Sequence, residues 1–167
     1  SGMKKESTEA SFGHFVSIID RLRSDGGCPW DREQTHQSIR QATLEEAYEV
    51  VHAIDTDDAA NLKEELGDLL LHVVFHSDIA QRAGRFSIDD VVAAISDKMV
   101  RRHPHVFGEA QAEDAEAVLR NWEELKKQER AAKGESAPAS LLDGVHRHVP
   151  AVMEAQAISE KAAKVGF

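Results

Sequence analysis

The sequence has a single cysteine, few aromatic residues and no long apolar run. Cys28 is that cysteine, which excludes an internal disulfide and every metal site built on several thiolates, and which fits a reducing cytoplasm. No apolar stretch approaches the roughly 20 residues of a membrane span, and the N-terminal residues lack the apolar core of a signal peptide. These absences predict a cytoplasmic protein with no membrane partner.

Basic charge is also scarce. The 167 residues carry 30 acidic against 20 basic side chains, which gives a formal net charge of -10. A nucleic-acid polymer is bound through basic surfaces, so this balance argues against such a partner. A smaller polyanion would need either a local basic patch or a bridging cation.

Strand signals are nearly absent, because apolar residues recur every three or four positions and seldom alternate. The pattern predicts an all-α chain with one helical domain at 12–130, a linker of small and polar residues at 131–140 and a helical tail at 141–167. Residues 1–11 are expected to be an expression scar, from Ser1-Gly2 ahead of Met3, and a disordered N-terminus.

Caps and breakers place the helices along this domain. A first helix is expected from Phe12 to Gly26-Gly27, followed by the loop DGGCPWD. The next two helices are joined by the short polar segment 55–61, which predicts antiparallel neighbours. Ser87 with Asp90 has the pattern of a capping box, and Pro104 should end the helix that starts there. A last helix of the domain is expected at 115–130.

Two groups of acids lie on the predicted antiparallel pair. On a helical wheel, Glu45, Glu46 and Glu49 share an arc of roughly 100°, opposite the apolar residues Leu44, Ala47, Tyr48, Val51 and Ile54. The second helix is apolar around most of its circumference and is expected to be buried. Its one polar stripe carries Glu65, Asp68, His72 and His76.

Carboxylates that converge in this way repel one another unless a cation lies between them. Oxygen ligands suit a hard cation, with Mg²⁺ the usual one beside phosphates and Zn²⁺ less suited. A structural role stays open for each single acid: Thr43 with Glu46 would make a capping box if a helix began there, and Glu64 lies off the stripe and could face solvent.

The acids also match a known signature. EEAYE at 45–49 followed by EELGD at 64–68 has the EExxE…ExxD pattern of the MazG family of nucleoside triphosphate pyrophosphohydrolases. The chain resembles this family over residues 12–130, since further segments match in order, among them GGCPWDREQTHQSI, AGRFSIDDVVAAISDKMVRRHPHVF and WEELKKQER. The tail resembles the stretch that leads into the second repeat of two-repeat members.

The resemblance implies an antiparallel helical bundle that assembles as a homodimer or higher homo-oligomer. Its implied activity is cleavage of the α–β phosphoanhydride of NTPs or dNTPs with Mg²⁺, for which Mn²⁺ is an expected substitute. The implied metal ligands are Glu46, Glu49, Glu65 and Asp68. Glu45 would orient water or substrate, so the catalytic set is Glu45, Glu46 and Glu49.

Basic residues for the phosphates are expected near the acids. Lys98, Arg101 and Arg102 stand one turn apart, Lys126 follows Trp122 by one turn, and all four match basic positions of the family. They could equally be the cations that commonly end helices. Trp30 and Trp122 could stack on a base or belong to the core. His103 and His105 could contact phosphate or finish a turn, and Cys28 is expected to be packing.

Two rival functions remain at this stage. A di-iron carboxylate protein needs two Glu-x-x-His motifs, and Glu49 with His52 supplies one. Because His52 lies about 60° or more off the acid arc, this rival is the weaker one. The other rival is a catalytically silent, dimerising or regulatory repeat of a longer two-repeat protein.

Overall fold

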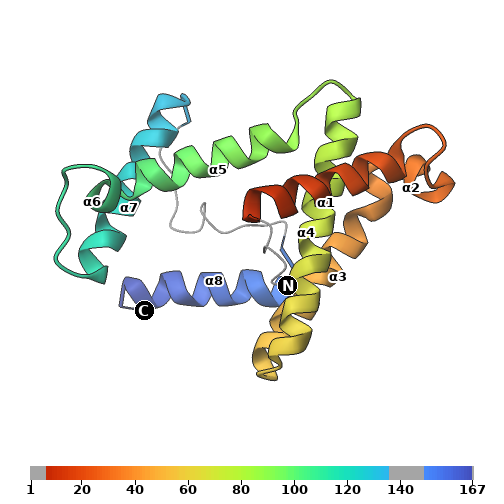
Figure 1. The fold of residues 1–167 in the computed structure, drawn as a ribbon. Helices are drawn as coiled ribbons and strands as arrows, with labels where there is room; N and C mark the ends of the chain where they lie inside the picture. The colour runs from red at the N-terminus through yellow and green to blue at the C-terminus, as the bar shows by residue number, and fades with distance from the viewer. Residues whose placement is uncertain (1–6, 136–148, 167) are drawn as a thin grey trace, which may run out of the picture. The chain divides into compact units, whose positions relative to one another are not determined.

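The computed structural model describes residues 7–135 and 149–166, and these segments contain helices and no strand (Figure 1). The all-α prediction is therefore confirmed for the described chain. The helices are α1 (Thr8–Arg23), α2 (Pro29–Glu33), α3 (His36–Asp55), α4 (Ala59–Arg82), α5 (Ile88–Arg102), α6 (Pro104–Phe107), α7 (Ala115–Ala132) and α8 (Ala151–Lys164). None of these described helices is both long and apolar enough to span a bilayer.

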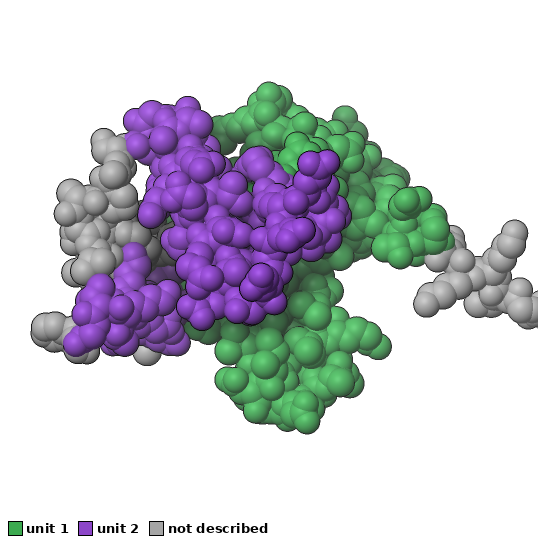
Figure 2. Space-filling model, turned by 90° about the vertical axis from the view of Figure 1, so that its left-hand side faces the viewer, with its two compact units in different colours: residues 1–98 green, residues 99–167 purple. Residues whose placement is uncertain are grey.

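The chain divides into two compact units, residues 1–98 and residues 99–167, coloured separately in Figure 2. The boundary falls within α5, after Lys98. Helix α7 runs through Ala132, two residues into the expected linker, and the part of that linker from residue 136 onward lies outside the described residues. Helix α8 lies within the tail expected at 141–167, of which residues 141–148 lie outside the described residues.

The first helix begins and ends earlier than its sequence suggests. The Ser7 side chain accepts a hydrogen bond from the Ala10 amide and caps α1 at Thr8, so the start expected at Phe12 was too late. Residues 1–6 lie outside the described residues. The helix stops at Arg23, before the two glycines. Gly27 is required in the turn that follows, because a β-carbon there would collide with main-chain oxygens of the last helical turn.

The expected DGGCPWD loop contains a helix that the sequence reading missed. Pro29 is the first residue of α2, a position where the missing amide hydrogen of proline costs nothing. The buried Arg23 guanidinium on α1 links this short helix to α4: it donates to the Asp31 carbonyl oxygen and to the Asp78 carboxylate, the latter at 2.6 Å. It also lies over the Phe75 ring, 4.7 Å from the centroid.

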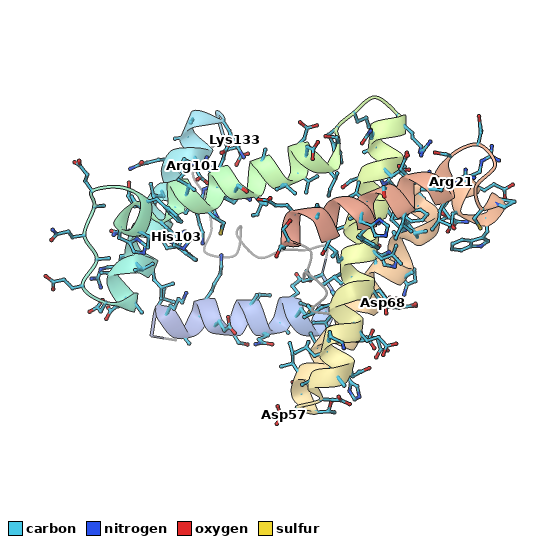
Figure 3. The ribbon with its side chains drawn as sticks, in the orientation of Figure 1. Arg21, Asp57, Asp68, Arg101, His103 and Lys133 are labelled. Carbon is cyan, nitrogen blue, oxygen red and sulfur yellow. The ribbon has the colours of Figure 1, made fainter. Side chains whose placement is uncertain are left out.

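Helices α3 and α4 are antiparallel, as expected. Contacts join the start of α3 to the end of α4, with His36 beside His76 and Thr43 beside His72. The turn between the helices is three residues long and lies at the tip of the pair, where Figure 3 labels Asp57. Asp57 adopts a left-handed conformation (φ 53°), which aspartate tolerates better than most residues. Asp58 caps α4 by accepting from the Asn61 amide at 3.0 Å.

The core of the first unit lies where α1 packs on the second half of α4. Its buried members are Ile19, Ile39, Val74, Phe75 and Ile88, with Phe12, Phe15, Val16, Leu71, Ile79 and Val91 packed against them. Ile88 opens α5, and the Ser87–Asp90 capping box is confirmed: the Asp90 carboxylate accepts from the Ser87 amide at 2.8 Å, and the Asp90 amide donates back to the Ser87 hydroxyl.

The expectation that α4 is buried is wrong for its first half. Leu66, Leu70 and Val73 are exposed, and buried residues of α4 begin at Val74. The apolar side of α3 is exposed as well, at Leu44, Tyr48, Val51 and Ile54, the last with 58% of its surface accessible. The α3–α4 pair therefore presents apolar residues that the core of the first unit does not cover.

In the second unit, Glu129 on α7 is the main ionic link to the end of α5. Its carboxylate accepts from Arg101 at 2.9 Å and from Arg102 at 2.8 Å. The hydrogen bonds from Arg102 and Arg101 lower the pKa of Glu129 from 4.5 to about 2. Pro104 follows the end of α5, as predicted, and opens the short helix α6.

Replacing Glu129 by glutamine is expected to lower the melting temperature by a few degrees near neutral pH. Because the folded-state pKa lies below the ordinary value, these ion pairs stabilise the folded chain above pH 4.5, and the contribution is lost as pH falls toward 2. The gap in melting temperature between wild type and Glu129→Gln should therefore narrow across that window. Glu116→Gln, which removes an exposed pair with Arg120, is the control. A gap independent of pH would contradict the assignment.

Candidate functional site

Three carboxylates from α3 and α4 lie close together. Glu46, Glu65 and Asp68 each offer an oxygen that lies within 4.8 Å of the oxygens of the other two. All three side chains are half-buried. Asp68 is labelled on α4 in Figure 3. These three residues are called the acid triplet below, and among the described residues they are the one group of three or more acids, histidines or cysteines at ligand distance.

The antiparallel pairing explains why the triplet forms. Glu46 lies near the middle of α3, while Glu65 and Asp68 stand three residues apart on the facing part of α4. The capping alternative for Glu46 is wrong, because α3 begins at His36 and is capped by Thr35. The Thr35 hydroxyl accepts from the Ser38 amide, and the Ser38 hydroxyl accepts from the Thr35 amide. Glu46 is therefore free of a capping role.

The triplet carries unfavourable charge. Partial burial, followed by the carboxylates of Glu49 and Asp68 and then Glu46, raises the pKa of Glu65. A cation held among these oxygens would offset both the repulsion between the carboxylates and the cost of burying their charge. The donor set consists of carboxylates alone, which fits a hard divalent cation such as Mg²⁺.

The other acids of the signature stand around the triplet. Glu49 is exposed and lies outside the group at ligand distance, yet it is the strongest charged neighbour of Glu65. Glu45 is exposed and accepts from the Gln41 side chain at 3.3 Å. Glu64 is exposed on α4, in agreement with the expectation that it faces solvent, and it has no ion-pair partner among the described residues.

The structure gives little support to a di-iron site. His52, which would complete the Glu49 motif, is exposed and lies outside the acid triplet. His72 and His76 share the polar stripe of α4 with the triplet, as the wheel predicts, but their nitrogens contact the Thr43 hydroxyl at 2.9 Å each. No described histidine joins the acids at ligand distance.

The predicted phosphate-binding cations are divided between the two units. Lys98 ends the first unit and has no ion-pair partner within the described chain. Arg101 and Arg102 lie in the second unit, where both pair with Glu129. Lys126, also in the second unit, pairs with Glu123 at 3.1 Å. The pairing with Glu129 was not anticipated from the sequence, because this glutamate lies 28 residues from Arg101 and 27 from Arg102.

The aromatic residues beyond α5 have structural contacts. The His103 ring meets Trp122 edge-on, with centroids 5.0 Å apart, and its Nδ1 donates to the Met99 carbonyl oxygen at 2.6 Å. His103 thus finishes the end of α5, one of the two roles considered for it. The His105 Nδ1 and Trp122 Nε1 atoms are buried and have no hydrogen-bond partner among the described residues. Figure 3 labels His103 and Arg101 in this region.

A network of polar side chains adjoins the acid triplet on the same two helices. Thr43, one turn before Glu46, contacts both His72 and His76, and the His76 Nδ1 lies 2.8 Å from the His36 Nδ1. These four residues are called the Thr–His network. Thr43 and His36 were not singled out for it from the sequence, because its contacts join residues 29 to 40 positions apart.

An apolar cavity of about 160 Å³ lies beside this network. It is lined by Ile19, Leu22, Trp30, Asp31, Ile39, Leu71, His72 and Phe75. Trp30 is 65% exposed, so its indole is not a core residue. His72 belongs both to the cavity wall and to the network, and it stands one turn after Asp68 of the triplet.

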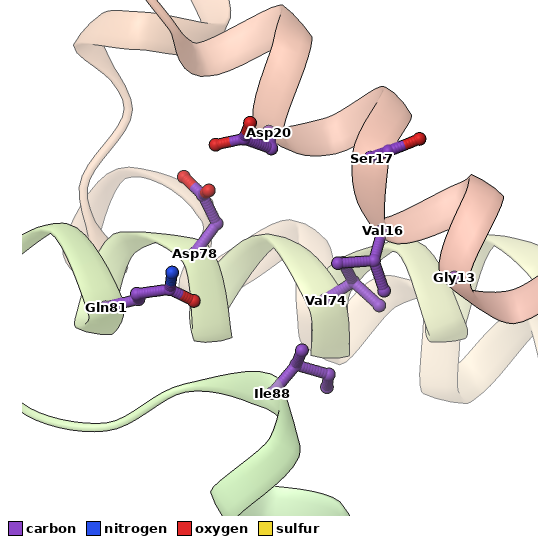
Figure 4. A pocket seen from close by; sticks show the side chains of 8 residues that line it. All are labelled: Gly13, Val16, Ser17, Asp20, Val74, Asp78, Gln81 and Ile88. Atoms are coloured by element: carbon purple, nitrogen blue, oxygen red, sulfur yellow. The ribbon is translucent and has the colours of Figure 1, made fainter.

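A second cavity, of about 270 Å³, lies between α1, α4 and the start of α5 (Figure 4). Its wall includes Val16, Val74 and Ile88 on the apolar side and Asp20 and Asp78 on the polar side. Arg82 pairs with both carboxylates, at 2.8 and 2.7 Å. This cavity is therefore lined by structural ion pairs and lacks a cluster of unpaired acids.

Comparison with known proteins identifies the family. The MazG nucleotide pyrophosphohydrolase domain matches residues 34–107. The crystal structure of a mazG-related protein from Thermotoga maritima superposes with a TM-score of 0.58 and 30% sequence identity, covering 69% of this chain and 98% of that one. The chain belongs to the MazG family. The matched MazG region contains the acid triplet, the Thr–His network and Lys98, while Trp30 and Lys126 lie outside it.

Longer MazG relatives are similar over most of this sequence. A protein of Escherichia coli K12 named nucleoside triphosphate pyrophosphohydrolase is 51% identical over 154 residues, which are 92% of this chain and 57% of that protein. A Thermotoga maritima protein named nucleoside triphosphate pyrophosphohydrolase/pyrophosphatase MazG is 44% identical over 93% of this chain and 58% of its own length. The chain thus spans somewhat more than half the length of these two relatives.

Proposed function

We propose that this chain is a Mg²⁺-dependent nucleoside triphosphate pyrophosphohydrolase that converts NTPs or dNTPs to the monophosphate and pyrophosphate. The observation that carries the proposal is the acid triplet, three carboxylates from two facing helices in a chain of the MazG family. The names of the relatives from Escherichia coli and Thermotoga maritima agree with this activity.

The metal would be held by Glu46, Glu65 and Asp68, with Glu49 as the fourth ligand. Glu49 fits this role because its charge already acts on Glu65. Mg²⁺ bound there would supply the positive charge that lets a triphosphate approach the carboxylates and that draws electrons from phosphorus. Mn²⁺, which also favours oxygen ligands, should substitute.

The reaction we propose is attack of water on the α-phosphorus. A bond forms between the water oxygen and this phosphorus, the bond to the bridging oxygen of the β-phosphate breaks, and pyrophosphate leaves with that electron pair. A carboxylate of this chain takes the proton from water. Glu45 is the candidate, because it is exposed next to Glu46 and is not one of the proposed metal ligands.

The β- and γ-phosphates would be bound by Lys98, Arg101, Arg102 and Lys126. Lys98 is the strongest of these candidates, because no described acid neutralises it. Arg101 and Arg102 would exchange part of their contact with Glu129 for phosphate oxygens, which guanidinium groups bind in a bidentate manner. Lys126 would release Glu123.

The nucleobase would enter the apolar cavity beside the network. Its volume of about 160 Å³ suits one ring system better than a whole nucleotide, since pockets for larger ligands start at roughly 300 Å³. The exposed Trp30 indole could stack on the base, the role considered for it from the sequence. The triphosphate would then extend from His72 toward Asp68.

The protein would act as a homodimer in the cytoplasm. The exposed apolar residues of α3 and α4 form a contiguous pattern along both helices, which on a monomer usually marks an interaction site. The single thiol at Cys28 fits a reducing compartment. The alternative, a catalytically silent repeat, is favoured by one observation: two of the four predicted phosphate ligands already pair with Glu129.

Incubation with Mg²⁺ and a panel of NTPs and dNTPs should release monophosphate and pyrophosphate in equal amounts. EDTA should stop the reaction and Mn²⁺ should restore it, because the carboxylates need a bridging cation. Ion-exchange chromatography and a pyrophosphate assay would measure the products. A folded protein that releases no pyrophosphate would favour the silent repeat. Release of inorganic phosphate alone would mean that the β–γ bond is cleaved instead of the α–β bond, which would contradict the proposal.

A further inference from the structure

The hydrogen bonds of the Thr–His network fix which atoms donate. The Thr43 hydroxyl makes three contacts, to the Ile39 carbonyl oxygen at 3.0 Å and to the His72 Nδ1 and His76 Nε2 atoms at 2.9 Å each. A hydroxyl has one hydrogen to donate and two lone pairs that accept. Since a carbonyl oxygen can only accept, the hydroxyl donates to Ile39, and both histidine nitrogens must donate to Thr43.

The rest of the network agrees with this direction. With a hydrogen on Nε2, a neutral His76 presents Nδ1 as an acceptor, and the His36 Nδ1 donates to it across 2.8 Å. Burial, and then the neighbouring rings of His36 and His72, lower the pKa of His76, which favours the neutral ring. All of these contacts can thus be made with every ring uncharged.

These hydrogen bonds determine which nitrogen of His72 carries the hydrogen. Its hydrogen is placed on Nδ1, so its Nε2 carries a lone pair and acts as an acceptor. No other described residue donates to this atom, and the ring lines the same cavity as Trp30. Because Nδ1 is used on the Thr43 side, the nitrogen available to a ligand in the cavity is Nε2.

We infer that His72 selects nucleotides whose base presents an exocyclic amino group to the cavity, as adenine does at C6 and cytosine at C4, where guanine and uracil carry an oxygen. This inference rests on the proposed function, which places the base there. An exocyclic amino group can donate to the His72 Nε2 lone pair, whereas an exocyclic oxygen at the same position would face another acceptor. Thr43 contributes as a positioning residue, because its hydroxyl keeps the ring hydrogen away from the cavity.

The test compares two nucleotides that differ only in the amino group, ATP and purine riboside 5′-triphosphate. Turnover gives kcat/KM with Mg²⁺, and calorimetry gives the Kd with Ca²⁺ in its place. The wild type should favour ATP about five- to tenfold in either measurement, the range expected for one hydrogen bond to an otherwise unpaired acceptor.

The Thr43 hydroxyl can be varied with little change in size. Thr43→Val removes the acceptor, so the His72 hydrogen can move to Nε2 and the preference for ATP should fall toward one. Thr43→Ser keeps the hydroxyl and should keep the preference. His72→Phe, which keeps an aromatic ring but has no nitrogen lone pair, should also lose it. Circular dichroism would establish that each variant is folded.

The outcomes separate the inference from the proposed function. Equal binding of the two nucleotides by the wild type, or an unchanged preference in Thr43→Val, would overturn the role of His72 even if turnover is rapid. Preferential binding of ATP without pyrophosphate release would support His72 and reject the enzyme. Failure to bind either nucleotide would overturn both.

Discussion

Replacing Glu65 by glutamine is expected to lower pyrophosphate release at least about a hundredfold and, at the same time, to stabilise the metal-free protein. The loss of activity follows if Glu65 is a ligand, because one fewer charge weakens the hold on a cation whose stabilisation of the reacting phosphate amounts to several kcal/mol. The gain in stability follows because burial and then the neighbouring carboxylates raise the pKa of Glu65, so a neutral side chain removes both the cost of burying a charge and a repulsion.

Glu64→Gln is the matched control, since it makes the same chemical change one residue away at an exposed position outside the acid triplet. Both variants and the wild type would be compared by pyrophosphate release and by melting temperature with and without Mg²⁺. Mg²⁺ should raise the melting temperature of the wild type and of Glu64→Gln, because a ligand of the folded state stabilises it, and much less that of Glu65→Gln. Equal activity in the two variants would rule out Glu65 as a metal ligand.

Much of this fold follows from local sequence patterns. Apolar spacing and caps act between residues three or four positions apart, and they correctly predict the helical class, the Ser87–Asp90 cap and the stop at Pro104. Two local signals were nonetheless ambiguous. Thr43 with Glu46 has the spacing of a capping box, but the helix starts earlier, at His36, after the cap residue Thr35, which forms the reciprocal pair with Ser38. The DGGCPWD segment has the composition of a loop and yet contains α2.

The candidate site also has features that the sequence predicts and features that it does not. The acids that share one helical arc could be predicted, because a wheel depends on neighbours along the chain. The pairing of Arg102 with Glu129 and the contact of Thr43 with His72 could not, since each joins residues more than 25 positions apart. Such contacts depend on how helices are placed in three dimensions, which a single sequence does not state.

The apolar side of α3 was expected opposite the acids, and the structure leaves this side exposed. Val51 is 51% accessible and Ile54 58%. Exposed side chains of this kind cost free energy in water, and the homodimer proposed above would bury them. Because the acid triplet lies on α3 and α4, assembly through this surface would also fix the position of the two helices and therefore of the three carboxylates.

Substituting Val51 by glutamate is therefore expected to turn a dimer into a monomer, with dimerisation weakened by about a hundredfold or more. An unpaired carboxylate buried in an apolar interface is strongly unfavourable. A hundredfold change corresponds to about 2.7 kcal/mol, which lies within the range measured for residues at the centre of an interface. Analytical ultracentrifugation over a range of concentrations would measure the change in mass.

His52→Glu is the control, because it adds the same charge at an exposed neighbour that points about 100° away around the helix. It should remain dimeric. If the dimer stabilises the α3–α4 pair, Val51→Glu should also lose pyrophosphate release at low protein concentration and regain part of it at high concentration, whereas a defect in the site itself would not depend on concentration. A wild-type protein that sediments as a monomer at every concentration would remove the basis for this surface as a dimer interface, while the acid triplet could still act within one chain.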